Sequence, residues 1–255
     1  MITVDTHCHV GLNWFEPVES LLFQMDSNGV DKAVLIQHRG SYDNSYILDC
    51  VTRFPARFVA IVLVDSVKQE SLNQLEEAVN LGATGVRLEP GDSDPIWEKA
   101  AQMDLVVSCQ GEVAEFGTDI FRDKIEGLPS LKIVLEHLGG VNKNEPYPYN
   151  SFAKMLKLAD LENVYLKVPG LGEIASRPGI LEKDFQLKDV PPFIEMSIES
   201  FGTSHLMWGS DFPPVSNREG YRNAKETIAN HKALKSDFDV ASVMGRTALD
   251  VFKFV

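Results

Sequence analysis

Cysteine is scarce in this chain, whose 255 residues include only Cys8, Cys50 and Cys109. The three are odd in number and widely separated, and no C-x-x-C motif is present. Disulfide-stapled folds need a dense, even set of cysteines, and cysteine zinc sites need closely spaced pairs. The sequence therefore argues against both.

Positive charge is also scarce: the chain has 24 Lys and Arg residues and 37 Asp and Glu residues, so its net charge is −13. Binding to nucleic acid or to anionic membranes requires a basic surface. No apolar run is long enough to span a bilayer, and the N-terminus has no basic segment followed by an apolar one. We therefore expect no nucleic acid or membrane partner, and a cytoplasmic chain whose mature form starts at Met1. Homo-oligomers are common among soluble enzymes, and the oligomeric state stays open.

Short β-rich segments alternate with stretches of helical period along the whole chain. The helical period is clear at Gln69–Leu81, Phe152–Ala159 and Phe193–Phe201. The predicted strands are Thr3–Thr6, Ala33–Gln37, Phe58–Val64, Gly85–Glu89, Leu105–Cys109, Lys132–Glu136, Val164–Val168 and Leu206–Gly209. This alternation, without a break in composition, predicts an α/β fold: a (β/α)8 TIM barrel in a single domain, residues 1–255. The alternative is a doubly wound open sheet, which usually has a Gly-rich phosphate-binding turn after its first strand; His7–Gly11 is no such turn.

The links from strand to helix are often longer than the links from helix to strand. Three are long and rich in Gly, Pro and polar residues: Gly139–Tyr149, Pro169–Val190 and Phe212–Glu219. In a barrel these loops lie at the C-terminal face, where active sites occur. Disordered decoration is the alternative for the middle of Pro169–Val190.

Four side chains at predicted strand ends carry the chemistry. His7 and His9 lie two residues apart and project to one side of a strand. His137 follows the sixth strand, and Asp211 follows the eighth, which ring closure places beside the first. Individually, Asp211 could be a helix N-cap and His137 a satisfied core histidine. Together, three imidazoles and a carboxylate suit either a mononuclear zinc-type site or a metal-free site with Asp211 as general base.

At this point the chain resembles the amidohydrolase superfamily, specifically the amidohydrolase-related branch that contains dicarboxylate and sugar-acid lactonases. The resemblance covers nearly the whole chain. It rests on the segments Asp5–His9, Gly85–Leu88, Glu136–Gly139, Asn163–Leu171 and Leu206–Pro213. It implies a TIM barrel with its site at the C-terminal face, a core set of His7, His9 and Asp211, and His137 as fourth member.

The chain departs from the binuclear members of this superfamily. They usually carry a bridging carboxylated Lys, or a Glu, on the fourth strand, where this chain offers Arg87 and Glu89. Its fifth strand ends without a histidine. We therefore expect one divalent metal, zinc first, held by His7, His9, His137 and Asp211, with metal-free catalysis as the close alternative.

Several other side chains are candidates for binding the substrate: Arg87, Lys167, Arg39, His38 and Gln110. In an acidic protein, cations gathered at one site favour a carboxylate or hydroxy acid. Arg87 and Lys167 lie in apolar runs, where an unpaired charge is costly. The alternative is that they pair with Glu89 or Asp65, and that Arg39 is merely exposed.

The resemblance and the predicted site together indicate a hydrolase that opens the lactone of a carboxylate-bearing or sugar acid. Asp211 would take a proton from water, and the metal or the histidines would stabilise the oxyanion. A metal-dependent, non-oxidative decarboxylase of an aromatic or unsaturated acid is the main alternative. A TatD-like nuclease, which also starts with a similar Asp-Thr-His-Cys-His, and a non-catalytic binding barrel are the remaining ones.

Overall fold

Eight parallel strands form one sheet in the order β1 to β8, each hydrogen-bonded to the next. A computed structural model describes residues 1–181 and 186–254. The strands are β1 (Val4–Cys8), β2 (Lys32–Ile36), β3 (Phe58–Val62), β4 (Ala83–Leu88), β5 (Val106–Cys109), β6 (Lys132–Leu135), β7 (Val164–Val168) and β8 (Leu206–Trp208). This confirms the predicted barrel, with strand ends shifted by a few residues.

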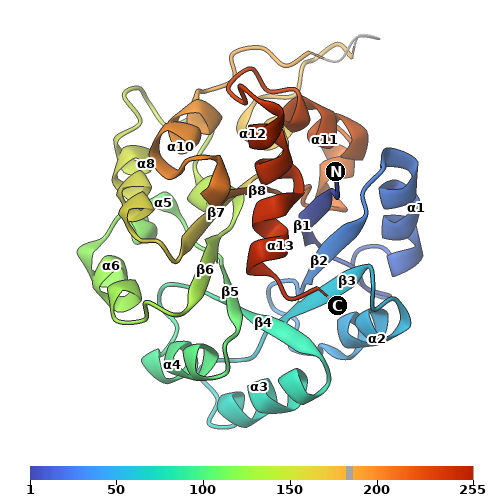
Figure 1. Ribbon diagram of the computed structural model, residues 1–255, viewed down its shortest axis with the longest axis vertical. Coiled ribbons are helices and arrows are strands. Elements are labelled where there is room, and N and C mark those ends of the chain that lie inside the picture. Colours follow the sequence, from blue (N-terminus) through green and yellow to red (C-terminus); the bar gives the residue numbers. More distant parts are fainter. Residues whose placement is uncertain (182–185, 255) are drawn as a thin grey trace.

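Helices surround the sheet on the outside (Figure 1). The α-helices are α1 (Val18–Asn28), α2 (Ser45–Arg53), α3 (Ser71–Asn80), α4 (Asp94–Gln102), α5 (Val113–Phe116), α6 (Asp119–Glu126), α8 (Asn150–Met155), α9 (Leu171–Ile174), α10 (Phe193–Phe201), α11 (Tyr221–Ala229), α12 (Asp237–Ala241) and α13 (Thr247–Val251). The segment labelled α7 (His137–Gly140) is a single left-handed turn. The 3-10 helices are η1 (Leu156–Asp160), η2 (Thr203–His205) and η3 (Pro214–Asn217), and η4 (Ser242–Arg246) is a π-helical turn. No helix in the described part of the chain is long and apolar enough to cross a membrane.

The barrel closes where β1 meets the segment after β8. The amide of Asp211 donates to the carbonyl of His7 at 2.9 Å, and the amide of His9 donates to the carbonyl of Phe212 at 2.8 Å. The Thr6 hydroxyl adds a bond of 2.7 Å to the Trp208 carbonyl. Ring closure therefore brings Asp211 beside the histidine pair, as the strand count predicts.

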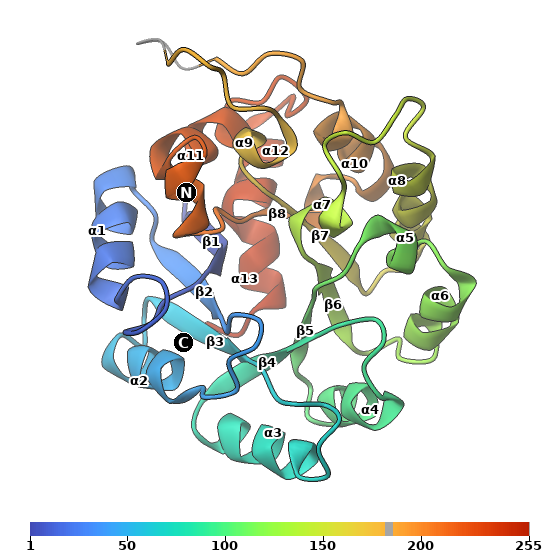
Figure 2. The same cartoon turned by 180° about the vertical axis from the view of Figure 1, so that it is seen from behind.

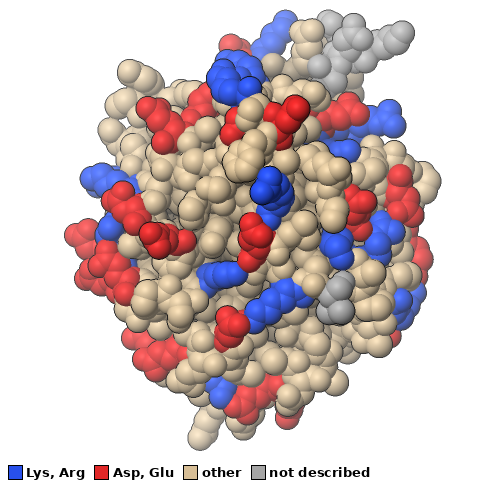
Figure 3. All heavy atoms as spheres, in the orientation of Figure 1, with Lys and Arg blue, Asp and Glu red and all other residues tan. Residues whose placement is uncertain are grey.

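Apolar side chains fill the interior of the barrel at its N-terminal end. Val34, Ile61 and Met207 belong to this cluster, together with Ala248 and Val251 of α13. Figure 1 shows α13 lying across this end of the barrel. Acidic and basic side chains are intermixed on the same face (Figure 3). The opposite end, with α7 and α9, is the nearer one in Figure 2 and carries the loops that follow the strands.

The link after β7 is only partly described. Within Pro169–Val190 the structure shows helix α9, and residues 182–185 lie outside the described part. The alternative of disordered decoration in the middle of this link falls partly on those residues and stays untested.

Candidate active site

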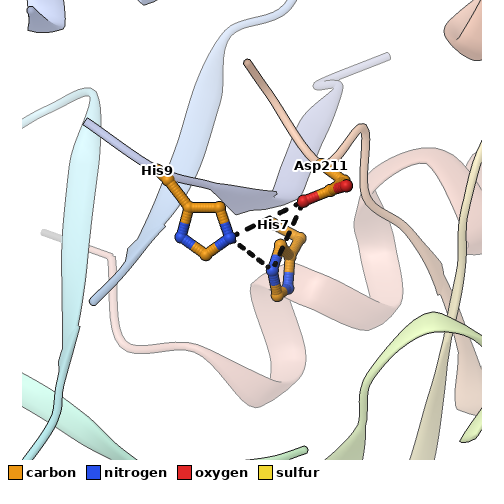
Figure 4. Close-up of side chains that lie close together, drawn as sticks. All are labelled: His7, His9 and Asp211. Atoms are coloured by element: carbon orange, nitrogen blue, oxygen red, sulfur yellow. Dashed lines mark hydrogen bonds and ion pairs between the residues drawn. The ribbon is translucent and has the colours of Figure 1, made fainter. Parts of the chain in front are cut away.

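Three imidazoles and one carboxylate converge at the C-terminal mouth of the barrel. The Nε2 atom of His7 lies 3.1 Å from Nε2 of His9 and 3.3 Å from Nε2 of His137. Oδ1 of Asp211 lies 3.6 Å from Nε2 of His9 and 4.0 Å from Nε2 of His7 (Figure 4). The four residues singled out from the sequence are thus brought together, and their chemical roles remain predictions.

Irregular backbone aims these side chains. The pairing of β1 with β2 shifts register between Asp5 and Cys8, which is the signature of a bulge, and bulges re-aim side chains. His137 and Asp211 have φ angles of 50° and 58°. This left-handed backbone conformation is seldom adopted by residues other than glycine. Such strain is concentrated at functional sites, where the surrounding structure holds it in place.

His9 and His137 each contact an acceptor through Nδ1, which leaves their Nε2 atoms free to accept. Nδ1 of His9 donates to the carbonyl of Ile36 at 2.8 Å, and Nδ1 of His137 faces Oε1 of Glu173 at 3.0 Å. Because both partners only accept, Nδ1 carries the proton in each ring. In the neutral rings the Nε2 lone pairs of His9 and His137 therefore point into the site.

A buried polar chain runs beneath His7. The Lys167 ammonium lies 3.1 Å from Nδ1 of His7 and donates to the Ser108 hydroxyl at 2.7 Å. That hydroxyl donates to Glu136 at 2.6 Å, and Arg87 binds both oxygens of Glu136 at 3.1 and 2.7 Å. All five side chains are buried, so the chain is a fixed support for the His7 ring.

Burial and neighbouring charges move the pKa values of these groups in different directions. Burial, together with the charge of Lys167, holds the pKa of His7 well below its usual value, so the ring is neutral. Burial also lowers the pKa of Lys167 to about 8, with the charge of Arg87 adding to the effect and Glu136 opposing it. For Glu136 itself, burial is outweighed by Arg87 and Lys167, and its pKa lies far below the usual value.

Neighbouring charges outweigh burial at the two residues nearest the opening. Burial would lower the pKa of His137, but the charge and hydrogen bond of Glu173 outweigh it and raise that pKa. Burial would raise the pKa of Asp211, but His9, His137 and Arg218 outweigh it and lower that pKa. Asp211 is therefore a carboxylate at neutral pH.

The predicted substrate-binding residues fall into two groups. Arg87 and Lys167 are buried, and Lys167 lies on the Nδ1 side of His7, away from His9. Arg87 pairs with Glu136, the residue after β6, so the alternative that it pairs with Glu89 or Asp65 is wrong. Whether either cation contacts a substrate stays a prediction.

The other three lie nearer the surface. Arg39 is exposed and pairs with Glu89 at 2.9 Å. The ring of His38 lies against Phe15, and its Nδ1 has no hydrogen-bond partner within residues 1–181 and 186–254. Gln110, which follows β5, is partly exposed.

The sequence analysis did not single out Glu173 on α9 or Arg218 just after η3. Arg218 contacts Oδ2 of Asp211 at 2.8 Å and Oε2 of Glu173 at 3.2 Å through one nitrogen. The available signal was their position, since both are charged residues in the long links after β7 and β8. Ser108 and Glu136 were likewise not singled out, although Glu136 stands beside His137 in a quoted motif.

His7, His9 and Asp211 offer ligand atoms within 4.8 Å of one another, a spacing that suits one divalent cation, and His137 lies beside His7. Zinc binds histidine nitrogen at about 2.0–2.1 Å, so neighbouring ligand atoms of a tetrahedral site lie about 3.3–3.4 Å apart. The Nε2 separations of 3.1 and 3.3 Å are close to this value. Coordination through Nε2 of His7 would put the ring proton on Nδ1, with Lys167 as a neutral amine accepting it. The lowered pKa of Lys167 makes that form accessible.

Two further groups have metal-like spacing: His7, Glu136 and His137, and His137, Glu173 and Asp211. In the first group Arg87 holds both oxygens of Glu136, and in the second Arg218 contacts both Glu173 and Asp211. Arg218 contacts Asp211 through Oδ2, so Oδ1 stays directed at His7 and His9. The set around His7, His9 and Asp211 is therefore the best candidate metal centre.

Known proteins resemble this chain in sequence and in fold. The 4-sulfomuconolactone hydrolase of Hydrogenophaga intermedia is 26% identical over 219 residues, which are 82% of this chain and 68% of the relative. A solved Pseudomonas putida structure, described as a candidate 2-pyrone-4,6-dicarboxylic acid hydrolase, has a TM-score of 0.80 at 21% identity. The match covers 98% of this chain and 97% of that one.

A solved amidohydrolase from Burkholderia multivorans with bound zinc also has a TM-score of 0.80, at 16% identity, and the match covers 98% of this chain and 99% of that one. At such identities the structural likeness establishes the fold. The amidohydrolase family model matches residues 4–254, nearly the whole chain. This chain therefore belongs to the amidohydrolase family.

Proposed function

We propose that this protein hydrolyses the ester bond of a lactone that carries a carboxylate or another acidic group. The observation that carries the proposal is the convergence of three Nε2 atoms and Oδ1 of Asp211 at the barrel mouth. The amidohydrolase family and the lactone hydrolase among the relatives support the same reaction class.

The proposed cofactor is a single zinc ion held by His7, His9, His137 and Asp211, with a fifth position left for water, because four fixed ligands alone would close the site. A bound divalent cation would supply Lewis acidity, which lowers the pKa of water and stabilises negative charge on a carbonyl oxygen. Without it, the same imidazoles would polarise the carbonyl by hydrogen bonding, and this metal-free mode is the alternative.

Asp211 is the proposed base for the attacking water. Its carboxylate is ionised at neutral pH, and Oδ1 faces the imidazoles while Oδ2 is held by Arg218. Asp211 would take a proton from water as the new C–O bond forms. It would return that proton to the alkoxide that leaves when the ring C–O bond breaks. The products are a hydroxyl group and a carboxylic acid, which ionises.

The proposed substrate carries negative charge, and the basic side chains that line a cavity beside the site support this. A cavity of about 1000 Å³ lies beside Glu173 and Arg218, and Lys143, Arg177 and Lys188 also line it. In the metal-free mode, Arg87 and a protonated Lys167 would add positive charge below the mouth, opposed by Glu136 and the buried Asp5. Arg39, His38 and Gln110 are the proposed direct contacts from the links after β2 and β5.

A panel of carboxylate-bearing lactones tests the proposal against its main alternative. Acid release from each lactone is followed in a pH-stat, and CO₂ release from aromatic and unsaturated acids is measured with the same preparation. We expect acid release from at least one lactone and no CO₂ release. Decarboxylation without lactone opening would replace the proposal with a decarboxylase.

A further inference from the structure

Arg218 lies at the centre of a group of charged side chains beside the candidate metal centre. Nη1 of Arg218 contacts Oδ2 of Asp211 at 2.8 Å and Oε2 of Glu173 at 3.2 Å. Nη2 donates to the carbonyl of Ser210 at 3.2 Å, and Nε lies 3.6 Å from Oε2 of Glu219. The guanidinium is therefore directed at protein groups on several sides.

Two of the carboxylates that Arg218 contacts, Asp211 and Glu173, have a second oxygen directed at the site. Asp211 gives Oδ2 to Arg218 and turns Oδ1 toward His9 and His7. Glu173 gives Oε2 to Arg218 and Oε1 to Nδ1 of His137. Two of the four converging donor groups thus depend on the same guanidinium, Asp211 directly and His137 through one intermediate.

Glu219, the residue after Arg218, holds the link after β8 against the link after β7. The Glu219 carboxylate accepts a hydrogen bond from the amide of Gly172 at 3.1 Å. It lies so close to the backbone that a Cβ at Gly170 or Gly172 would overlap it. The link after β8 is thereby fixed against the link after β7, which keeps Arg218 in reach of Glu173.

We propose that Arg218 is a positioning residue, whose guanidinium sets the carboxylate of Asp211 directly and the imidazole of His137 through Glu173. The inference rests on the hydrolytic function proposed above and adds a requirement of the same site. Outer groups that orient metal ligands typically account for about 10–100-fold in metal affinity or activity. Without Arg218, the Asp211 carboxylate would be free to rotate and Glu173 would lose the cation that orients it.

Four variants test this role: Arg218→Ala, Arg218→Lys, Glu173→Gln and the control Arg222→Ala. Arg222 lies on α11, and its side chain is 68% exposed. Zinc affinity is measured by competition with a chromophoric chelator, and kcat and KM are measured on the best lactone of the panel. Circular dichroism and thermal melting confirm that each variant is folded.

We expect Arg218→Ala to lose about 10–100-fold in zinc affinity and in kcat, with little change in KM. Arg218→Lys and Glu173→Gln should lose less, and Arg222→Ala should match the wild type. Millimolar guanidinium should partly restore kcat to Arg218→Ala, whereas urea, which is similar in shape but neutral, should not. A merely structural role would not give this rescue.

A folded Arg218→Ala variant with unchanged zinc affinity and kcat and a raised KM would overturn the proposal, because it would make Arg218 a substrate contact. The zinc measurement needs no substrate, so it tests the positioning role even if the wild type opens no lactone. If the wild type is active without zinc, the kcat of Arg218→Ala and its rescue by guanidinium decide whether Arg218 is a positioning residue. A wild type that neither binds zinc nor opens a lactone would overturn both proposals.

Discussion

Nε2 of His7 and Nε2 of His137 lie 3.3 Å apart although 130 residues separate them in the chain. His7 is directed by β1, and His137 by the first turn after β6. The proton of His137 is on Nδ1, facing Glu173, so its Nε2 lone pair faces His7. A divalent cation binds neutral imidazoles whose nitrogen lone pairs converge. The predictions on metal removal rest on this arrangement of His7 and His137.

Removal of metal should inactivate the protein. We expect about one zinc per chain and loss of lactone opening after treatment with a strong chelator, with activity restored by added zinc. His7→Ala should retain less zinc than the wild type, because it removes a central donor. Elemental analysis of protein purified without added metal, paired with activity assays, measures both effects.

The matched control for the metal prediction is His205→Gln. His205 lies on η2, before β8, at the other end of the barrel. It should keep its zinc and its activity. Full activity after complete removal of metal would contradict the zinc proposal and favour the metal-free alternative.

Arg87→Met should destabilise the fold strongly. Glu136 is buried, and Arg87 binds both of its oxygens, so the variant leaves a buried carboxylate with one cation fewer. Breaking a buried ion pair on one side costs about 3–5 kcal/mol. Urea unfolding measures the change. Arg39→Met, which removes an exposed cation, should stay within about 0.5 kcal/mol of the wild type. Equal stabilities for the two variants would contradict the structural role of Arg87.

The stability of the metal-free protein should rise with pH in a window set by Lys167. Its pKa is about 8 in the folded chain, where burial disfavours the charge, against an ordinary value of 10.5. Between these values the unfolded chain binds more protons than the folded chain, so the free energy of unfolding increases with pH. The contribution is complete above 10.5 and is lost as the pH falls through 8.

Lys167→Met isolates this contribution from other titrating groups. Urea unfolding of both proteins, with chelator present and at several pH values across the window, gives two slopes. The wild type should show the steeper rise. Parallel slopes would mean that burial does not shift the pKa of Lys167.

The sequence predicts the barrel and the four converging side chains because both follow from chain order. Strands that alternate with helices must lie next to each other, and strand-end residues must then meet at one face. His7, His137 and Asp211 need only this information. The resemblance to the amidohydrolases adds the reaction class, which topology alone does not provide.

The contacts of Arg87 and Arg218 depend on the three-dimensional fold, not on the neighbouring residues in the sequence. Arg87 pairs with Glu136 across the barrel rather than with the nearby Glu89, because inward-facing side chains reach strands that are not their neighbours. Arg218 and Glu173 meet only through the conformations of two long links. Hydrophobic periodicity says nothing about such conformations, so these partners could not be predicted.

The turnover of Asp211→Asn, on a lactone that the wild type opens, tests whether Asp211 is the general base. Asn keeps the shape of the side chain and removes its basicity. Acid release in a pH-stat should show kcat lowered by about 10²–10⁴-fold, the usual contribution of a general base. Asp160→Asn, an exposed change at the end of η1, should be as active as the wild type. Near-full activity of a folded Asp211→Asn preparation, free of wild-type protein, would contradict the account.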